Sequence, residues 1–254
     1  LNDINYRVKN SRISNDFGNK DWKYGTEETY LKDLISYWLN HYDWKKQEKE
    51  INKFSHYKIK IDNIPIHFMY EKGSGENSKP LILTHGWPWT FWDYQKVIGP
   101  LAHPEQYGGD IEQSFDVIVP SLPGYGFSTP LKETGINFWR TSDLWVQLMT
   151  DILGYKKFFA HGGDWGAAVT LQLGHKYSEI VPAIHTHMAV PIDFVTNPHP
   201  DISFYSDSEK KWHEKNMDFV TEGNGYFQIQ ASRPQTLSYG LNDSPIGLLA
   251  WLIE

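Results

Sequence analysis

The chain has 254 residues, of which 40% are hydrophobic and 15% aromatic, and its net charge is −7. This composition is typical of a globular protein, and the absence of cysteine excludes disulfides, thiolate catalysis and cysteine metal sites. Acidic and basic residues are mixed without a basic stripe, so nucleic acid is not expected as a partner.

Targeting signals are not visible in the sequence. No apolar run approaches the length of a membrane span, and no signal peptide or membrane anchor is apparent. Leu1 stands where a methionine would be expected, so an upstream segment is left open. The sequence does not determine the compartment or the oligomeric state, and the cytoplasm is the default expectation for this segment.

The first stretch of the chain is expected to be irregular and then helical. We interpret Thr26 as an N-cap, because Glu27 and Glu28 follow it in a first turn. The apolar residues that recur at helical spacing after this cap are Tyr30, Leu31, Leu34, Ile35 and Trp38. A second short helix is predicted over residues 43–54.

The middle of the chain predicts an α/β fold. Residues 58–61 and 64–70 read as a β-hairpin with a turn at Asp62-Asn63. Apolar strands at 81–84, 115–120, 157–160 and 183–189 then alternate with helices at 92–101, 138–153 and 166–176. Such alternation predicts a mostly parallel sheet with helices on both faces.

After residue 191 the alternation stops and helices dominate. A helix is predicted over 206–220, and Pro234 and Ser244-Pro245 are helix-start signals. This module is expected to form a cap over the carboxyl edge of the sheet, where open α/β sheets place their sites.

The sharpest motif is Gly162-Gly163-Asp164-Trp165-Gly166, which follows a predicted strand and precedes a helix. This is the context of a nucleophile elbow, a turn so tight that residues two before and two after the tip must be small. The tip is Asp164, where most elbows have serine. An ordinary aspartate N-cap is the alternative interpretation.

A carboxylate at the tip changes the chemistry that the elbow can perform. It attacks a saturated carbon and forms an alkyl ester on Asp164, which water must then hydrolyse. The second step requires an oxyanion hole and a general base, usually a histidine held by a carboxylate.

The predicted oxyanion hole comes from His85-Gly86-Trp87-Pro88, which follows the strand at 81–84. We assign its two donors to the backbone N–H groups of Trp87 and Trp165, and a cis peptide before Pro88 would tighten the loop. The alternative is a strand-ending turn without a role.

A glycine-containing segment follows the strand at 115–120. Pro123-Gly124-Tyr125-Gly126-Phe127-Ser128 carries two glycines, but Thr129 occupies the third position of a dinucleotide fingerprint. We therefore expect no nicotinamide or flavin site there and interpret the segment as a structural turn beside the site. No metal cluster is recognised, and no cofactor is expected.

These motifs resemble those of the epoxide hydrolases of the α/β-hydrolase superfamily, specifically the microsomal-type branch with an N-terminal extension. The resemblance covers nearly the whole chain. It includes residues 22–47 in the extension, the two core motifs, and residues 225–230, 233–234 and 241–245 at the start of the cap. It implies an α/β-hydrolase core with an N-terminal helical extension and a partial helical cap.

The resemblance also implies further roles. Tyr226 stands at the place of a cap tyrosine that binds the oxirane oxygen and protonates the alkoxide. The resemblance places the general-base histidine, the catalytic acid and a second tyrosine after Glu254. We do not expect His161, His185, His187 or Asp193 to replace them, and His161 is expected to make a local hydrogen bond.

The resemblance divides the chain into three parts. Residues 1–56 form an extension that packs on core and cap, residues 57–191 the first part of the core, and residues 192–254 an incomplete cap. The last core strands are expected to be absent, so the chain is interpreted as a piece of a longer protein. On its own, this piece is expected to be alkylated at Asp164 without turnover.

The implied function is the hydrolysis of epoxides to vicinal diols. A small apolar or aromatic epoxide and water are the expected partners, and the candidate pocket residues are Trp87, Pro88, Trp165, Phe194 and Tyr226. One alternative is a haloalkane dehalogenase with the same aspartate elbow, in which the Trp165 indole would bind halide. The other is a non-catalytic, hydrolase-like binding protein.

Overall fold

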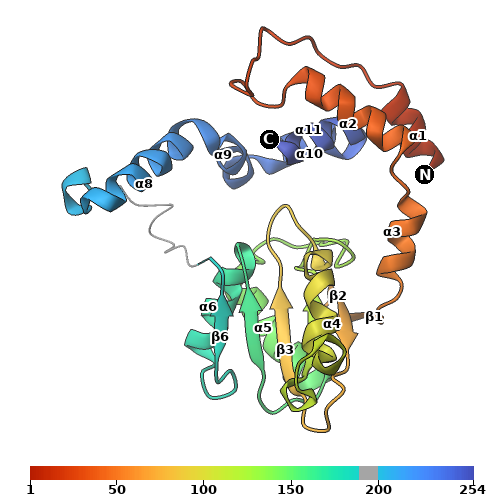
Figure 1. Cartoon of the computed structure of the whole chain (residues 1–254), viewed down its shortest axis with the longest axis vertical. Coiled ribbons are helices and arrows are strands. Elements are labelled where there is room, and N and C mark those ends of the chain that lie inside the picture. The colour runs from red at the N-terminus through yellow and green to blue at the C-terminus, as the bar shows by residue number, and fades with distance from the viewer. Residues whose placement is uncertain (189–199) are drawn as a thin grey trace. The chain divides into compact units, whose positions relative to one another are not determined.

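The computed structural model describes residues 1–188 and 200–254, which belong to two compact units (Figure 1). The sheet unit comprises Lys45–Val195, and the helical unit joins Leu1–Trp44 to Thr196–Glu254. The three-part division at residues 56 and 191 stays a prediction.

The sheet unit is built on a six-stranded sheet with the order β1-β2-β4-β3-β5-β6. Its strands are β1 (His56–Ile61), β2 (Ile64–Glu71), β3 (Lys79–Thr84), β4 (Phe115–Pro120), β5 (Phe159–Gly162) and β6 (Ile184–Thr186). The pairs β1–β2 and β2–β4 are antiparallel, and the pairs β4–β3, β3–β5 and β5–β6 are parallel. The predicted, mostly parallel sheet is confirmed.

Helices cover both faces of this sheet. On one face, the 3₁₀ turn η1 (Phe91–Tyr94) and α4 (Gln95–Ala102) pack on alternate residues of β3 and β4, including Leu83 and Val119. On the other face, α5 (Phe138–Gln147) and α6 (Trp165–Lys176) pack on Ile82 and Ile118. Successive strand residues point to opposite faces, which explains why these strands read as continuous apolar runs.

The topology marks one point at the carboxyl edge of the sheet where a site is expected. After β3 the chain crosses through α4 to β4 on one side, and β5 lies on the other side of β3. The strand order reverses at β3, and the helices that follow β3 and β5 lie on opposite faces of the sheet. Open α/β sheets bind ligands at such a point.

Several sequence-based boundaries are confirmed and others are corrected. The hairpin has its turn at Asp62 and Asn63, both at positive φ. The strand predicted at 157–160 begins only at Phe159, because Leu81 of β3 first pairs there. The strand predicted at 183–189 is limited to Ile184–Thr186 within the described residues.

The remaining elements of the sheet unit are short. The helix predicted at 43–54 is α3 (Trp44–Ile51), which begins at the unit boundary. The 3₁₀ turns η2 (Pro104–Tyr107) and η3 (Ile111–Gln113) connect α4 to β4, and a π-helical turn, η4 (Leu148–Ile152), continues α5.

The helical unit combines both ends of the chain. It contains α1 (Asn2–Lys9), α2 (Glu28–Asn40), α8 (Asp207–Asp218), α9 (Gly225–Ser232), α10 (Pro234–Asp243) and α11 (Pro245–Ile253), with the turns η5 (Ile202–Phe204) and η6 (Phe219–Gly223). Its small core joins Val8 of α1, Leu31 of α2 and Ile246 of α11. Residues far apart in sequence thus share one apolar centre.

Helix starts in this unit were predicted with mixed success. The helix predicted from residue 206 begins with a capping box between Ser206 and Glu209. Ser244 caps α11, as the sequence indicated. The Thr26 cap is wrong, since Glu27 is the N-cap and Thr26 Oγ donates to the carbonyl of Ala250 at 2.7 Å. The stretch expected to be irregular also contains α1.

Candidate active site

Asp164 lies at the tip of the turn between β5 and α6. Its backbone has φ 52° and ψ −127°, a region that costs a non-glycine residue about 1–3 kcal/mol and is found at functional turns. The side chain is half-buried and makes no capping hydrogen bond to α6. Asp164 thus occupies the N-cap position of α6 without capping it through its side chain, and the carboxylate is held at the sheet edge by the turn itself.

The glycines around this tip are required by close backbone contacts. A Cβ on Gly162 would lie 2.2 Å from the carbonyl oxygen of Gly166, and one on Gly166 would lie 1.9 Å from that of Thr84. A Cβ on Gly163 would lie 1.8 Å from the His187 ring. Only residues without a Cβ allow α6 to start this close to β3, which explains the small residues of the motif.

Thr84, at the end of β3, is fixed from both faces of the sheet. The Tyr94 hydroxyl donates to its carbonyl at 2.8 Å, and the buried Trp145 indole N–H donates to its hydroxyl at 3.0 Å. The loop that carries His85 and Gly86 therefore leaves the sheet from an anchored residue.

The loop after β3 supplies a hydrogen bond to the aspartate. The backbone N–H of Trp87 donates to Oδ1 of Asp164 at 2.8 Å, and the peptide before Pro88 is cis, as expected. Trp165 is the first residue of α6, so its N–H has no intrahelical acceptor and lies at the positive end of the helix. Of the two proposed donors, Trp165 directly follows Asp164 in the chain, and the N–H of Trp87 contacts the Asp164 side chain.

Two neighbouring residues were not identified as site residues from the sequence. His85, 1% exposed, links the loops after β3 and β4 through its two ring nitrogens. Burial lowers the pKa of His85 to about 4, so the ring is neutral near pH 7. Tyr125 packs edge-on against His85, and burial together with the Asp164 charge raises its pKa to about 12.

The segment that contains Tyr125 is the structural turn that the sequence indicated. Gly124 and Gly126 have positive φ, and the Gly124 N–H donates to the Ser128 carbonyl at 3.0 Å. Its position directly after β4 is the signal that could have directed attention to Tyr125.

The other candidate residues are distributed between the units. Tyr226 belongs to the helical unit, where it is half-buried in the first turn of α9. The helix starts at Gly225, directly after the π-helical turn η6, and this local context was not recognised in the sequence. Phe194 and Asp193 lie outside the described residues. Pro88 is half-buried and Trp165 is exposed.

The histidines near β5 and β6 form a local group. His161 Nδ1 lies 2.8 Å from His185 Nδ1, which confirms the predicted local hydrogen bond, and the His187 ring packs nearby. Burial and the neighbouring imidazoles lower the pKa of His161. Within residues 1–188 and 200–254, no group of histidine, aspartate and glutamate side chains has the geometry to hold a metal ion.

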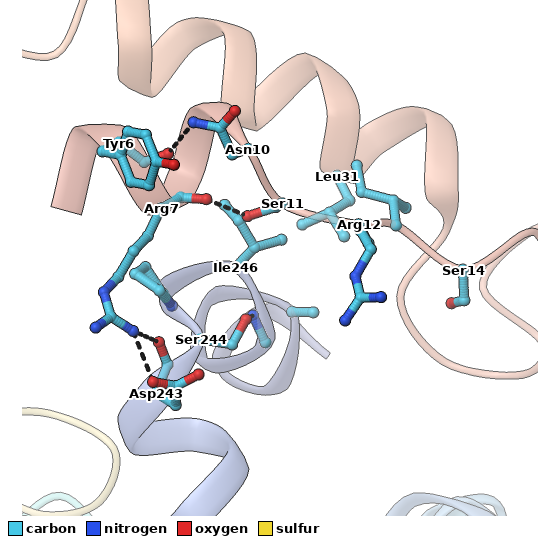
Figure 2. Close-up of a pocket in the computed structure, with 14 residues that line it drawn as sticks. Tyr6, Arg7, Asn10, Ser11, Arg12, Ser14, Leu31, Asp243, Ser244 and Ile246 are labelled. Carbon is cyan, nitrogen blue, oxygen red and sulfur yellow. Dashed lines mark hydrogen bonds and ion pairs between the residues drawn. The ribbon is translucent and has the colours of Figure 1, made fainter. Parts of the chain in front are cut away.

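A separate pocket of about 490 Å³ lies in the helical unit (Figure 2). Its lining comes from α1, the chain after α1, Leu31 of α2 and the start of α11. The Arg7 guanidinium bonds to Asp243 at 2.6 Å at one end of it. None of the candidate site residues that the structure describes lines this pocket.

Comparisons with known proteins agree with this fold. Residues 79–226 match the family model for the alpha/beta hydrolase fold, and residues 1–94 match the model named epoxide hydrolase N terminus. The chain therefore belongs to the α/β-hydrolase fold family. Within that family it belongs to the branch that carries the epoxide hydrolase N terminus.

Relatives of known name are similar to the whole chain. It is 38% identical to a protein of Stigmatella aurantiaca provisionally named an epoxide hydrolase, and 33% identical to epoxide hydrolase 1 of Oryctolagus cuniculus. Both alignments include 100% of this chain but 57% and 59% of the relatives. The chain thus spans less than two thirds of their length.

A solved structure is similar as well. The Aspergillus niger epoxide hydrolase matches with a TM-score of 0.86 and 29% identity, over 100% of this chain and 66% of that one. Among the described residues, no helix combines the length and the apolar character needed to cross a membrane.

Proposed function

We propose that this chain is the nucleophile-bearing part of an epoxide hydrolase, which adds water to an epoxide and releases a vicinal diol. The observation that carries the proposal is Asp164, a half-buried carboxylate at a strained elbow tip with Oδ1 held by the Trp87 N–H at 2.8 Å. The names of its relatives support the substrate class.

The first step is the alkylation of Asp164. Because Oδ1 is engaged by Trp87, we assign Oδ2 as the atom that attacks a ring carbon. The ring C–O bond breaks, its electron pair goes to the oxirane oxygen, and Tyr226 gives that oxygen a proton. A carboxylate is suited to this displacement at a saturated carbon. The product is a hydroxyalkyl ester of Asp164.

The second step is the hydrolysis of this ester. Water bonds to Cγ of Asp164 and passes a proton to a general base. We propose a histidine in this role, and we assign the role to none of the histidines in residues 1–254. Negative charge develops on Oδ1, where the N–H groups of Trp87 and Trp165 stabilise it. The Cγ–Oδ2 bond then breaks, the alkoxide takes the proton that the general base received from water, and the diol leaves with Oδ2. The new carboxyl group gives the second proton of that water to the Tyr226 phenolate. The carboxylate is restored with one oxygen from water.

The site suggests the kind of epoxide. The proposed contacts are Trp87, Pro88, Trp165, Phe194 and Tyr226. Their side chains favour an apolar or aromatic substituent on the ring. The haloalkane dehalogenase alternative shares the first step but requires no cap tyrosine, and the match to the epoxide hydrolase N terminus weighs against it.

A single-turnover experiment tests this mechanism. The intact protein, in excess over an aryl epoxide in H₂¹⁸O, should release unlabelled diol, because the added oxygen comes from Asp164. Repeated turnover should then place ¹⁸O in the peptide that contains Asp164. The control is Asp164→Asn, in which ester formation should stop. ¹⁸O in the first diol would mean direct attack of water, and a protein without any adduct or diol would favour the non-catalytic alternative.

A further inference from the structure

The His85 imidazole bridges two loops at the carboxyl edge of the sheet. Its Nδ1 lies 2.9 Å from the carbonyl oxygen of Gly86, and its Nε2 lies 3.1 Å from the backbone nitrogen of Leu122. A carbonyl can only accept and a backbone N–H can only donate, so Nδ1 carries the proton and Nε2 accepts. The two contacts therefore select a single neutral tautomer.

The carbonyl that His85 holds belongs to the peptide unit that contacts Asp164. The Gly86 C=O and the Trp87 N–H share one planar amide, and this peptide is trans. In a trans peptide the oxygen and the hydrogen point in opposite directions. His85 binds one side of the plane, and Oδ1 of Asp164 accepts from the other side at 2.8 Å. Fixing the carbonyl thus fixes the direction of the N–H.

We propose that His85 is a positioning residue that aims the Trp87 N–H at Asp164 by holding the Gly86 carbonyl. It acts through this peptide, without contact with the reacting atoms. The reaction step that it affects rests on the proposed function, whereas the hydrogen-bonded geometry does not.

The imidazole is itself held in place from the β4 side. Leu122 follows Ser121, whose hydroxyl bonds to Nδ1 of the buried His67 at 2.9 Å and whose N–H donates to the His67 carbonyl at 2.8 Å. Tyr125 packs edge-on against the His85 ring. The acceptor at Nε2 is therefore anchored in the sheet, and the ring cannot rotate without breaking a buried hydrogen bond.

This arrangement should matter more in the second step than in the first. A hydrogen bond to a carbonyl polarises the N–H of the same amide and strengthens it as a donor. During alkylation Oδ1 loses charge, but during ester hydrolysis Oδ1 becomes the oxyanion. A misdirected N–H therefore slows ester hydrolysis and leaves ester formation largely intact.

Three substitutions of His85 separate its two contacts. In His85→Asn the side-chain amide can still donate to the Gly86 carbonyl. In His85→Gln the longer amide can accept from the Leu122 N–H, but the donor to Gly86 is lost. His85→Phe retains the ring shape and loses both hydrogen bonds. The Asn variant is thus the conservative control for the other two.

The effect of these substitutions on kcat, KM and ester accumulation is measured in the intact protein with an aryl epoxide. For the Gln and Phe variants kcat should fall about tenfold to hundredfold, less than the loss of a complete oxyanion donor. KM should fall in parallel, and the mass of an alkylated Asp164 peptide should accumulate. The Asn variant should stay within a few-fold of the native kcat. Unchanged kcat in His85→Gln, or a lower kcat without lower KM and without ester accumulation, would overturn the proposal.

A second measurement does not depend on turnover or on variants. In the native protein, the ¹³C and ¹⁵N shifts of the His85 ring should report the Nδ1–H tautomer near pH 7. An Nε2–H tautomer would overturn the proposal, because such a ring cannot accept from Leu122. If the native protein forms no ester on Asp164, the proposed reaction fails. The tautomer measurement alone then tests whether His85 holds the Gly86 carbonyl.

Discussion

A Cβ atom added to Gly86 would lie 2.3 Å from the Cβ of Asp164. Real Cβ atoms do not approach this closely, and neither partner is the flexible end of a long side chain. The loop after β3 therefore contacts the elbow by backbone, and the hydrogen bond between Trp87 and Asp164 depends on this approach.

Replacing Gly86 with alanine should uncouple the oxyanion loop from the nucleophile. The new methyl group must displace the loop, so the Trp87 N–H moves out of hydrogen-bonding distance of Oδ1. Loss of such a donor costs about 10²–10³-fold in turnover. Steady-state kinetics of the intact protein measure this effect. Gly240→Ala on α10 is the control, because a Cβ there meets nothing within 4 Å. Equal activity of the two variants would contradict the assigned role of the loop.

Stability should depend on pH through two buried histidines. Burial lowers the pKa of both His67 and His85 to about 4, whereas an unfolded histidine titrates near pH 6.5. Between these values the unfolded chain binds protons that the folded chain excludes. The unfolding free energy should therefore fall as the pH is lowered from about 6.5 to about 4, by at most about 3 kcal/mol for each histidine.

Urea unfolding at pH 7 and pH 4.5 measures this dependence. His67→Gln removes one of the two groups, so its unfolding free energy should change less between the two pH values than that of the native protein. The matched control is His175→Gln on α6, which replaces an exposed ring outside this network. A His67→Gln variant with the native pH dependence would show that His67 does not contribute.

The features that local sequence determines could be predicted. The strand at 115–120 agrees with β4 at both ends, because an apolar run lies between Ser114 and the proline that ends it. The elbow was recognised because its geometry requires small residues at fixed offsets around Asp164. The cap at Ser244 is likewise a contact within one helical turn.

What could not be predicted depends on partners distant in the sequence. Thr26 has the residue type of an N-cap, but its hydroxyl binds Ala250, 224 positions away. The bridge from His85 to Leu122 spans 37 positions, so the motif alone indicated the loop and not the tautomer that holds it. Sequence periodicity carries no information on such pairs.

Asp116 should be the most costly carboxylate to remove from the sheet unit. It is 1% exposed and accepts from Lys72 Nζ at 2.6 Å, from the Gly73 N–H at 2.9 Å and from the Tyr155 hydroxyl at 2.7 Å. Asp116→Ala leaves the buried Gly73 N–H without its acceptor, whereas the Tyr155 hydroxyl keeps its contact with the Tyr70 hydroxyl at 2.9 Å. We expect the unfolding free energy to fall by about 2–4 kcal/mol, measured by urea denaturation.

The control for this variant is another aspartate in an ion pair. Asp207 bonds to Lys210 at 2.6 Å, but its side chain is 95% exposed, so Asp207→Ala should remain close to the native stability. Similar losses in both variants would show that the buried hydrogen bonds of Asp116 contribute little.

Tyr226 offers the test that separates epoxide from halide chemistry. Opening an epoxide leaves an alkoxide that must gain a proton, whereas a halide leaves as a stable anion. Tyr226→Phe in the intact protein should therefore lower kcat/KM for an aryl epoxide by about 10²-fold, the lower end of the range of general acid catalysis. Alkylation of Asp164 by an alkyl halide should be unaffected. Tyr239→Phe, on the exposed side of α10, is the matched control. Epoxide turnover at the native rate in the Tyr226 variant, together with halide release, would favour the dehalogenase alternative, because only that reaction proceeds without a proton donor at this position.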